Sequence, residues 1–142
     1  MIVAGEASGD LHGANLIKAL KQLNPELEVS GLGGPLMSQA GAEIYYNMMD
    51  LAVVGFTEVI KNLNEFKRVF KMLLEKLDSK PPDCVVLIDY PGFNLRLARE
   101  VKKRKIPVIY YISPQVWAWR RDRVKLIRKL VDRMLVIFEF ES

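Results

Sequence analysis

Four loop-like segments of the 142-residue chain hold residues that could do chemistry, and one of them contains a candidate general base. Asp89 directly follows a continuous apolar run at 84–88, so its carboxylate has apolar neighbours. Such surroundings can tune a carboxylate as a general base or let it hold a sugar hydroxyl. The alternative is a structural aspartate that caps the next helix. Asn94 is the better cap for a helix beginning at 95, so Asp89 has no evident structural role of its own and is available for a functional one.

Two glycine-rich segments could let a phosphate or a sugar approach the backbone. Residues 5–10 read Gly-Glu-Ala-Ser-Gly-Asp, and such small residues expose the N–H groups of a following helix. Their spacing matches neither a P-loop nor the dinucleotide-binding fingerprint. Residues 31–35 read Gly-Leu-Gly-Gly-Pro and predict a second open turn. The alternative in both cases is a plain turn, with Asp10 capping the first helix and with a positive φ in the second segment.

Two further segments combine aromatic or apolar side chains with cations. Residues 117–123 hold two tryptophans and three arginines, which could stack on sugars, acyl chains or bases and bind phosphate. The alternative is one tryptophan in the core and solvated arginines. A predicted helix over 57–77 places Lys and Arg between apolar residues. It is either an interfacial helix that cradles acyl chains or a core-packed amphipathic helix with a wet charged face.

The elements that must position these segments alternate regularly along the chain. Short apolar runs predict strands, and stretches of helical period between them predict helices. This order implies βαβ units, and therefore one Rossmann-like α/β domain with a parallel sheet and helices on both faces. In such sheets, ligands bind at the carboxyl ends of the strands. The predicted strands are 2–4, 29–32, 44–46, 84–88, 108–112 and 134–138, and the predicted helices are 10–24, 35–41, 57–77, 95–104 and 117–130.

Composition and charge exclude several classes of protein. The chain is 50% hydrophobic and 27% charged, which excludes a disordered, collagen-like or disulfide-stapled chain. With one His and one Cys, neither a zinc cluster nor a Cys/His dyad is expected. No apolar run approaches the roughly 20 residues of a membrane span, and no signal peptide is expected.

Positive charge is concentrated in one block. Residues 1–95 carry 8 bases and 12 acids, whereas residues 96–133 carry 13 bases and 3 acids. The block would attract a phosphorylated ligand, an anionic membrane or nucleic acid, unless it is simply two solvated helix faces. A nucleic-acid binder would show a steep salt dependence.

Five segments in order resemble those of the lipid-A-disaccharide synthase family, glycosyltransferases of Gram-negative bacteria. They are AGEASGD (4–10), GLGGPLM (31–37), VGFTEV (54–59), IDYPGFN (88–94) and SPQVWAWR (113–120). The resemblance runs over essentially the whole chain. It implies two Rossmann-like halves facing a cleft. Residues 1–142 would form the N-terminal, acceptor-side half, and the C-terminal nucleotide-sugar domain would be absent from this chain.

The resemblance also implies an activity. The family is an inverting one that joins UDP-2,3-diacylglucosamine to 2,3-diacylglucosamine 1-phosphate through a β-1,6 linkage and releases UDP, without a metal or a cofactor. Its members are cytoplasmic and peripheral on the inner membrane, so the expected partners are both substrates and an anionic membrane surface, and not nucleic acid. The family is more than twice this length, so the chain alone would be inactive. The resemblance leaves open whether the protein is a homodimer. The alternative to a glycosyltransferase is a non-catalytic Rossmann-like module that binds an acylated sugar phosphate or a membrane surface.

Carried over residue by residue, the resemblance makes Asp89 the general base for the acceptor's 6-hydroxyl. Two departures stand out: Gly92 occupies a position where the family usually has an acid, and residues 137–141 lack a proline that the family usually has there. The expected acyl or membrane contacts lie at the long helix: Phe56, Ile60, Leu63, Phe66 and Phe70. The expected substrate-binding residues are Glu6, Ser8, Gly9, Asp10, Gly33, Gly34, Glu58, Asn94, Ser113, Gln115, Trp117 and Arg120.

Overall fold

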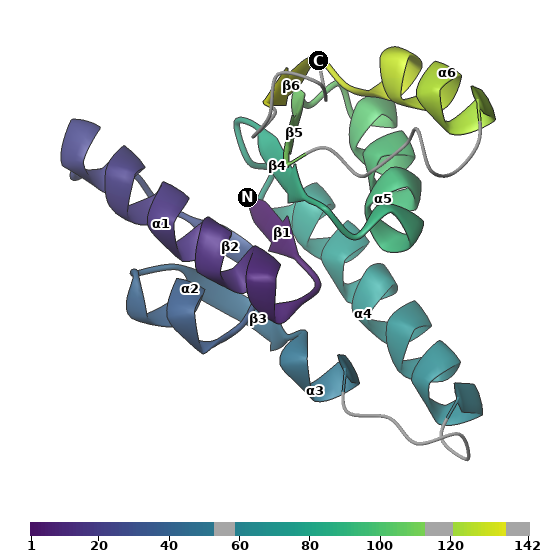
Figure 1. Ribbon diagram of the computed structural model, residues 1–142, viewed down its shortest axis with the longest axis horizontal. Helices are drawn as coiled ribbons and strands as arrows, with labels where there is room; N and C mark the ends of the chain where they lie inside the picture. Colours follow the sequence, from purple (N-terminus) through teal and green to yellow (C-terminus); the bar gives the residue numbers. More distant parts are fainter. Residues whose placement is uncertain (53–58, 113–120, 136–142) are drawn as a thin grey trace.

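Strands and helices alternate along the chain, as the sequence predicts (Figure 1). The computed structural model describes residues 1–52, 59–112 and 121–135. Its strands are β1 Ile2–Ala4, β2 Ser30–Gly33, β3 Glu43–Asn47, β4 Val85–Ile88, β5 Val108–Tyr111 and β6 Arg133–Leu135. Its helices are α1 Ala7–Leu23, α2 Pro35–Gln39, α3 Met49–Ala52, α4 Val59–Ser79, α5 Pro91–Lys103 and α6 Arg121–Leu130.

The strands form one parallel sheet in the order β3-β2-β1-β4-β5-β6. Val3 of β1 pairs with Leu32 on one side and with Leu87 of β4 on the other. The chain therefore adds β2 and β3 on one side of β1, and then crosses over to add β4, β5 and β6 on the other side. This reversal between β1 and β4 is the topological switch point, where open α/β sheets bind ligands. The predicted Rossmann-like architecture is confirmed.

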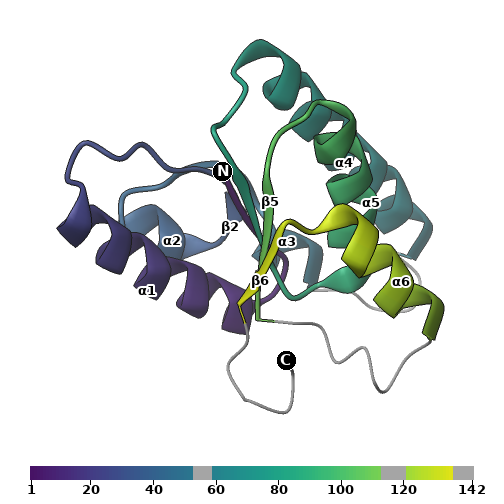
Figure 2. The same cartoon turned by 90° about the horizontal axis from the view of Figure 1, so that it is seen from above.

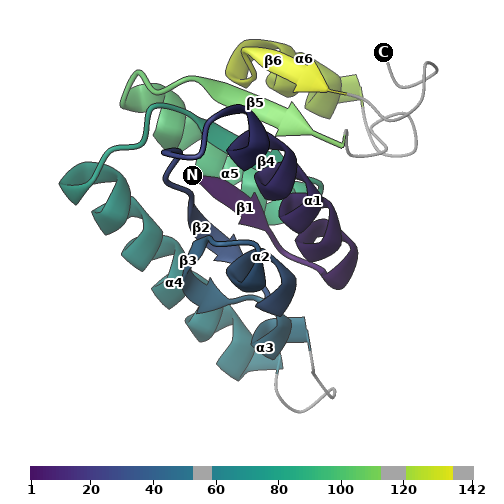
Figure 3. The same cartoon turned by 90° about the vertical axis from the view of Figure 1, so that its left-hand side faces the viewer.

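The helices cover the two faces of the sheet. Figures 2 and 3 show α1 and α2 on one face, with α4, α5 and α6 on the other. Side chains alternate between the faces, so Val86 and Ile88 of β4 pack with α1, whereas Val85 and Leu87 pack with α4 and α5. All four residues are buried, as the continuous apolar run predicts for a strand that is covered on both faces.

Several element ends differ from the predicted ones. Helix α1 begins at Ala7, three residues before the predicted cap, and α5 begins at Pro91, since proline suits the first helical position. Strand β5 ends at Tyr111 because Ile112 takes a φ of 62°, and the short α3 was not predicted. The predicted elements at 57–58, 117–120 and 136–138 lie outside the described residues. Within the described part, no helix is both long and apolar enough to cross a membrane.

Candidate active site

Asp89 lies at the carboxyl end of β4, beside the topological switch point. It is half-buried, and it begins a tight turn that leads into α5. Asp89 and Tyr90 take φ values of 44° and 49°, so two consecutive non-glycine residues have left-handed backbone conformations. Such a conformation costs about 1–3 kcal/mol per residue and persists only where the surroundings enforce it. The predicted general base therefore sits on a strained turn.

Two buried side chains hold this turn through the Asp89 carbonyl oxygen. The Asn94 Nδ2 group donates to it at 2.8 Å and to the carbonyl of Ile88 at 3.2 Å. The Tyr110 hydroxyl donates to it at 2.6 Å from the neighbouring strand β5. Tyr110 and Asn94 are both 0% exposed. The prediction that Asn94 caps the following helix is wrong, because α5 already begins at Pro91 and Asn94 lies inside its first turn.

The first glycine-rich segment lies against the same turn. The Tyr90 ring packs so closely on Gly5 that a β-carbon there would fall 2.3 Å from the ring. Burial, and secondly the Glu6 carboxylate, raise the pKa of Tyr90 above its usual 10. Glu6 and Ser8 are exposed at the start of α1, where no described side chain caps the helix. Glu6 is therefore an exposed carboxylate at the N-terminus of α1, next to Gly5, on which the Tyr90 ring packs.

Asp10 has a different neighbour from the one predicted. Glu6 occupies the N-cap position of α1, so the prediction that Asp10 caps its own helix is wrong. The Asp10 carboxylate instead accepts three hydrogen bonds at the start of α2, from the backbone N–H groups of Gly34, Leu36 and Met37, at 2.9, 3.0 and 3.0 Å. Asp10 is 2% exposed. It therefore joins the first glycine-rich loop to the second.

The second glycine-rich loop is packed and not open. Gly31 does take a positive φ, of 150°, as the plain-turn alternative predicts for this segment, whereas Gly34 at the start of α2 has a φ of −132°. A β-carbon on Gly34 would fall 2.6 Å from Asp10 Oδ2, and one on Gly33 would fall 2.4 Å from Met37 Sδ. Gly9 is also buried, within 3.2 Å of the Ala4 β-carbon by the same measure. These glycines allow close packing of α1 and α2 on the sheet.

An apolar groove between α4 and α5 begins at the Asp89 turn. Its volume is about 550 Å³, within the usual range of ligand pockets. The α4 side contributes Leu63, Phe66 and Phe70, and Leu63 is 55% exposed. Tyr90 and Phe93 form the α5 side, with the Phe70 and Phe93 ring centroids 5.5 Å apart. Three of the five expected acyl contacts are therefore brought together.

Cations surround this groove. Lys67, Lys71 and Arg96 line it, and no acidic side chain does so among the described residues. The groove lies along one face of α4, and the acyl-chain interpretation of that face stays a prediction. Its other face carries Val69, Leu73 and Leu77 into the core. The arrangement suits a ligand with apolar chains and an anionic group.

The remainder of the basic block is partly neutralised on the surface. Arg104 binds Asp78 and Glu100, and Lys102 contacts Asp132 with 2.6 Å between nitrogen and oxygen. These pairs connect α5 to the end of α4 and to β6. They are exposed or partly exposed pairs, which are worth little in stability. Among the described residues of this block, Arg96 reaches the groove.

Several predicted site residues fall in the parts of the chain that the structure does not describe. Glu58, Ser113, Gln115, Trp117, Arg120 and Phe56 lie outside the described residues, and Ile60 lies in α4 without a described side chain. Sequence reasoning missed Tyr90 and Tyr110. A signal for Tyr90 was present, since it lies between the candidate base and the proline that starts α5. In the described part of the chain, no group of three His, Cys, Asp or Glu side chains could hold a metal ion.

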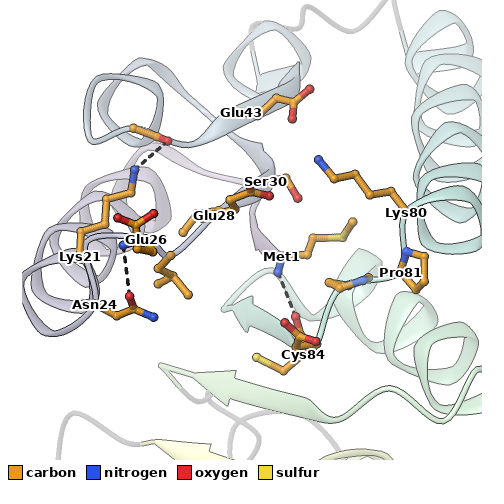
Figure 4. A pocket seen from close by; sticks show the side chains of 15 residues that line it. Met1, Lys21, Asn24, Glu26, Glu28, Ser30, Glu43, Lys80, Pro81 and Cys84 are labelled. Atoms are coloured by element: carbon orange, nitrogen blue, oxygen red, sulfur yellow. Dashed lines mark hydrogen bonds between the residues drawn. The ribbon is translucent and has the colours of Figure 1, made fainter.

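A second cavity of about 660 Å³ lies at the opposite end of the sheet (Figure 4). It is lined by residues at, or just before, the starts of the strands, among them Met1, Ser30 and Cys84. Figure 4 shows side chains of both signs around it, including Lys80 and Glu43. None of the predicted site residues that the structure describes lines it, so the candidate site remains at the carboxyl ends of the strands.

Comparison with known proteins identifies relatives over the full chain. The profile of the lipid-A-disaccharide synthetase family matches residues 1–142. A lipid-A-disaccharide synthase of Geobacter sulfurreducens is 52% identical over 141 residues, which cover 99% of this chain and 37% of that protein. A lipid-A-disaccharide synthase of Coxiella burnetii is 48% identical over 142 residues, or 100% of this chain and 38% of that protein. The same name belongs to a Koribacter versatilis protein that is 50% identical, with 100% and 37% covered.

The chain thus spans 37–38% of the length of these curated relatives. The matches confirm the resemblance seen in the five sequence segments, and the parallel sheet agrees with the fold it implies. The chain belongs to the lipid-A-disaccharide synthetase family.

Proposed function

We propose that this chain is the acceptor-side domain of a glycosyltransferase that forms the lipid A disaccharide. The substrates are UDP-2,3-diacylglucosamine and 2,3-diacylglucosamine 1-phosphate, and the products are a β-1,6-linked disaccharide and UDP. The names of the relatives support the reaction class. One observation carries the assignment to this site: Asp89 lies on a strained turn at the switch point, beside an apolar groove with a cationic rim.

Asp89 acts as the general base in this proposal. Its carboxylate takes the proton of the acceptor's 6-hydroxyl while that oxygen forms a bond to the anomeric carbon of the donor sugar. The bond from this carbon to the UDP oxygen breaks at the same time, and UDP leaves with the electron pair. Attack opposite to the leaving group inverts the anomeric configuration. The UDP-binding residues belong to a nucleotide-sugar domain outside this chain.

The groove between α4 and α5 takes acyl chains. Leu63, Phe66 and Phe70 give it an apolar wall, and Tyr90 joins that wall to the Asp89 turn. An acyl chain in the groove would therefore bring its sugar toward Asp89. Lys71 and Arg96 on the rim favour the phosphate of the acceptor or anionic headgroups of the inner membrane, on which the protein would be peripheral and cytoplasmic. Phe56 and Ile60 remain proposed contacts of the same kind.

The remaining predicted residues divide by their surroundings. Exposed Glu6 and Ser8 are the proposed direct contacts to sugar hydroxyls, whereas buried Asp10 and Asn94 support the loops that carry them. Gly9, Gly33 and Gly34 serve the packing of those loops. Glu58, Ser113, Gln115, Trp117 and Arg120 remain proposed substrate contacts.

The test is the reaction of the full-length protein with both acylated substrates. Stoichiometric UDP and disaccharide, identified by mass spectrometry, are the expected products. Replacing Leu63 and Phe66 by asparagine should raise the KM for the acylated acceptor at least tenfold. The matched control is Leu23→Asn, an exposed leucine at the end of α1. Acceptor binding without any UDP release would contradict the proposal and favour the non-catalytic module.

A further inference from the structure

The Asp89 turn is fixed from two directions by residues outside it. Asn94 reaches back from the first turn of α5, and Tyr110 reaches across from β5. In the sheet register, Tyr110 lies opposite Leu87, two residues before Asp89. Its hydroxyl therefore reaches Asp89, the first residue after the end of β4. Both donors meet at one atom, the Asp89 carbonyl oxygen.

We infer that Tyr110 is a positioning residue for the proposed reaction, because its hydroxyl holds the Asp89 backbone in the left-handed conformation that directs the carboxylate. This inference rests on the proposed function, which makes Asp89 the base. Backbone dihedral angles set the direction of the bond from Cα to Cβ, so a relaxed turn would point the carboxylate elsewhere. A base must lie within hydrogen-bond reach of the proton it removes, and small displacements are costly.

The surroundings of Tyr110 support a specific role over general packing. Its hydroxyl is a buried polar group in a core that Leu87, Leu97 and Val108 make apolar, and phenylalanine would fill the same space. The hydroxyl donates at 2.6 Å to the backbone of the strained residue. Asn94 supplies the second constraint, and its backbone N–H closes the turn on the Tyr90 carbonyl at 3.0 Å. Asp89 and Tyr90 are not glycines, so their left-handed conformations are unfavourable without support. The hydrogen bonds from Tyr110 and Asn94 supply that support.

The first experiment measures kcat and KM for Tyr110→Phe in the full-length protein. We expect kcat to fall at least tenfold, with KM changed less than twofold, because binding groups stay in place. Val108→Ala is the matched control for stability, since it removes a buried side chain of the same strand at its other end. Val108→Ala should lower the unfolding midpoint about as much as Tyr110→Phe does, while its kcat stays within twofold of the wild type. A kcat of Tyr110→Phe within twofold of the wild type would overturn the inference.

A double-mutant cycle with Asp89→Asn separates positioning from a structural effect. If Tyr110 acts through Asp89, removing its hydroxyl changes the residual rate of Asp89→Asn less than twofold. Additive losses would overturn the inference. A wild-type protein that forms no disaccharide would refute the proposed function instead.

A crystal structure of Tyr110→Phe tests the positioning independently of turnover. The structure should show Asp89 with a φ that has left the left-handed region, or a carboxylate displaced relative to the Tyr90 ring. An unchanged Asp89 would overturn the inference whatever the wild-type activity is.

Discussion

The connection of two loops through Asp10 gives a quantitative prediction about stability. Asp10→Ala removes a buried carboxylate that accepts three backbone N–H groups at the start of α2. Helix α2 has only five residues, so few other bonds hold it. After the substitution, at least the N–H groups of Gly34 and Met37 remain buried without their acceptor.

The size of the loss follows from these bonds. A hydrogen bond to a charged group contributes about 1.5–3 kcal/mol, and each buried N–H group left without an acceptor costs about 1–3 kcal/mol. We therefore expect Asp10→Ala to lower the free energy of unfolding by about 4 kcal/mol. Asp10→Asn keeps an oxygen that can accept from Gly34 and Met37, which both bond to Oδ1, and loses the bond from Leu36. Its expected loss is smaller, about 1–2 kcal/mol.

Urea unfolding followed by circular dichroism measures both losses, and thermal unfolding gives an independent check. For a domain of this size, about 4 kcal/mol corresponds to a drop in the melting temperature of about 10–20 °C. The decisive result is the order of stability: the wild type should be the most stable, Asp10→Asn intermediate and Asp10→Ala the least stable. A loss below about 1 kcal/mol for Asp10→Ala, or equal losses for Asn and Ala, would refute the structural role of this carboxylate.

Three further substitutions test local features. Gly5→Ala should displace the Tyr90 ring and destabilise the protein by about 1–3 kcal/mol in urea unfolding, and an unchanged midpoint would contradict the observed packing. Gly92→Ala should stabilise it by about 0.5–1 kcal/mol, because Gly92 lies in the first turn of α5 with nothing within 4 Å of an added β-carbon. Destabilisation would contradict that open environment. Lys102 and the Val108 N–H hold the pKa of the Asp132 carboxyl below its usual value, so its contribution is present above about pH 4 and is lost as pH falls further. Asp132→Asn should therefore be less stable than the wild type at pH 7 and equal to it near pH 2, and a difference that persists at low pH would count against this cause.

The sheet could be predicted from the sequence because its signals are local. The apolar run of β4 and the β-branched run of β5 have the composition of buried parallel strands, and both are found where predicted. The starts of α1 and α5 were predicted less well, since capping residues were read from nearby sequence alone. Asp10 and Asn94 do bond to backbone groups, but to α2 and to the end of β4, respectively.

The candidate site depends on contacts between distant segments, which a single sequence does not reveal. Asp89 was identified by its place after a buried strand, yet the left-handed turn depends on Tyr110, which is 21 residues away. The groove was predicted only as one helix, because its other wall, with Tyr90 and Phe93, belongs to α5. Periodicity shows that α4 is amphipathic, but it does not show which element packs beside it.

The central claim is that Asp89 is the general base, and the turnover of Asp89→Asn tests it most directly. Asparagine keeps the shape of the side chain but cannot take a proton, so the rate of disaccharide formation by the full-length protein should fall by roughly 10²–10⁴-fold. Acceptor binding, measured on the same variant, should change little. A rate close to that of the wild type would contradict the account.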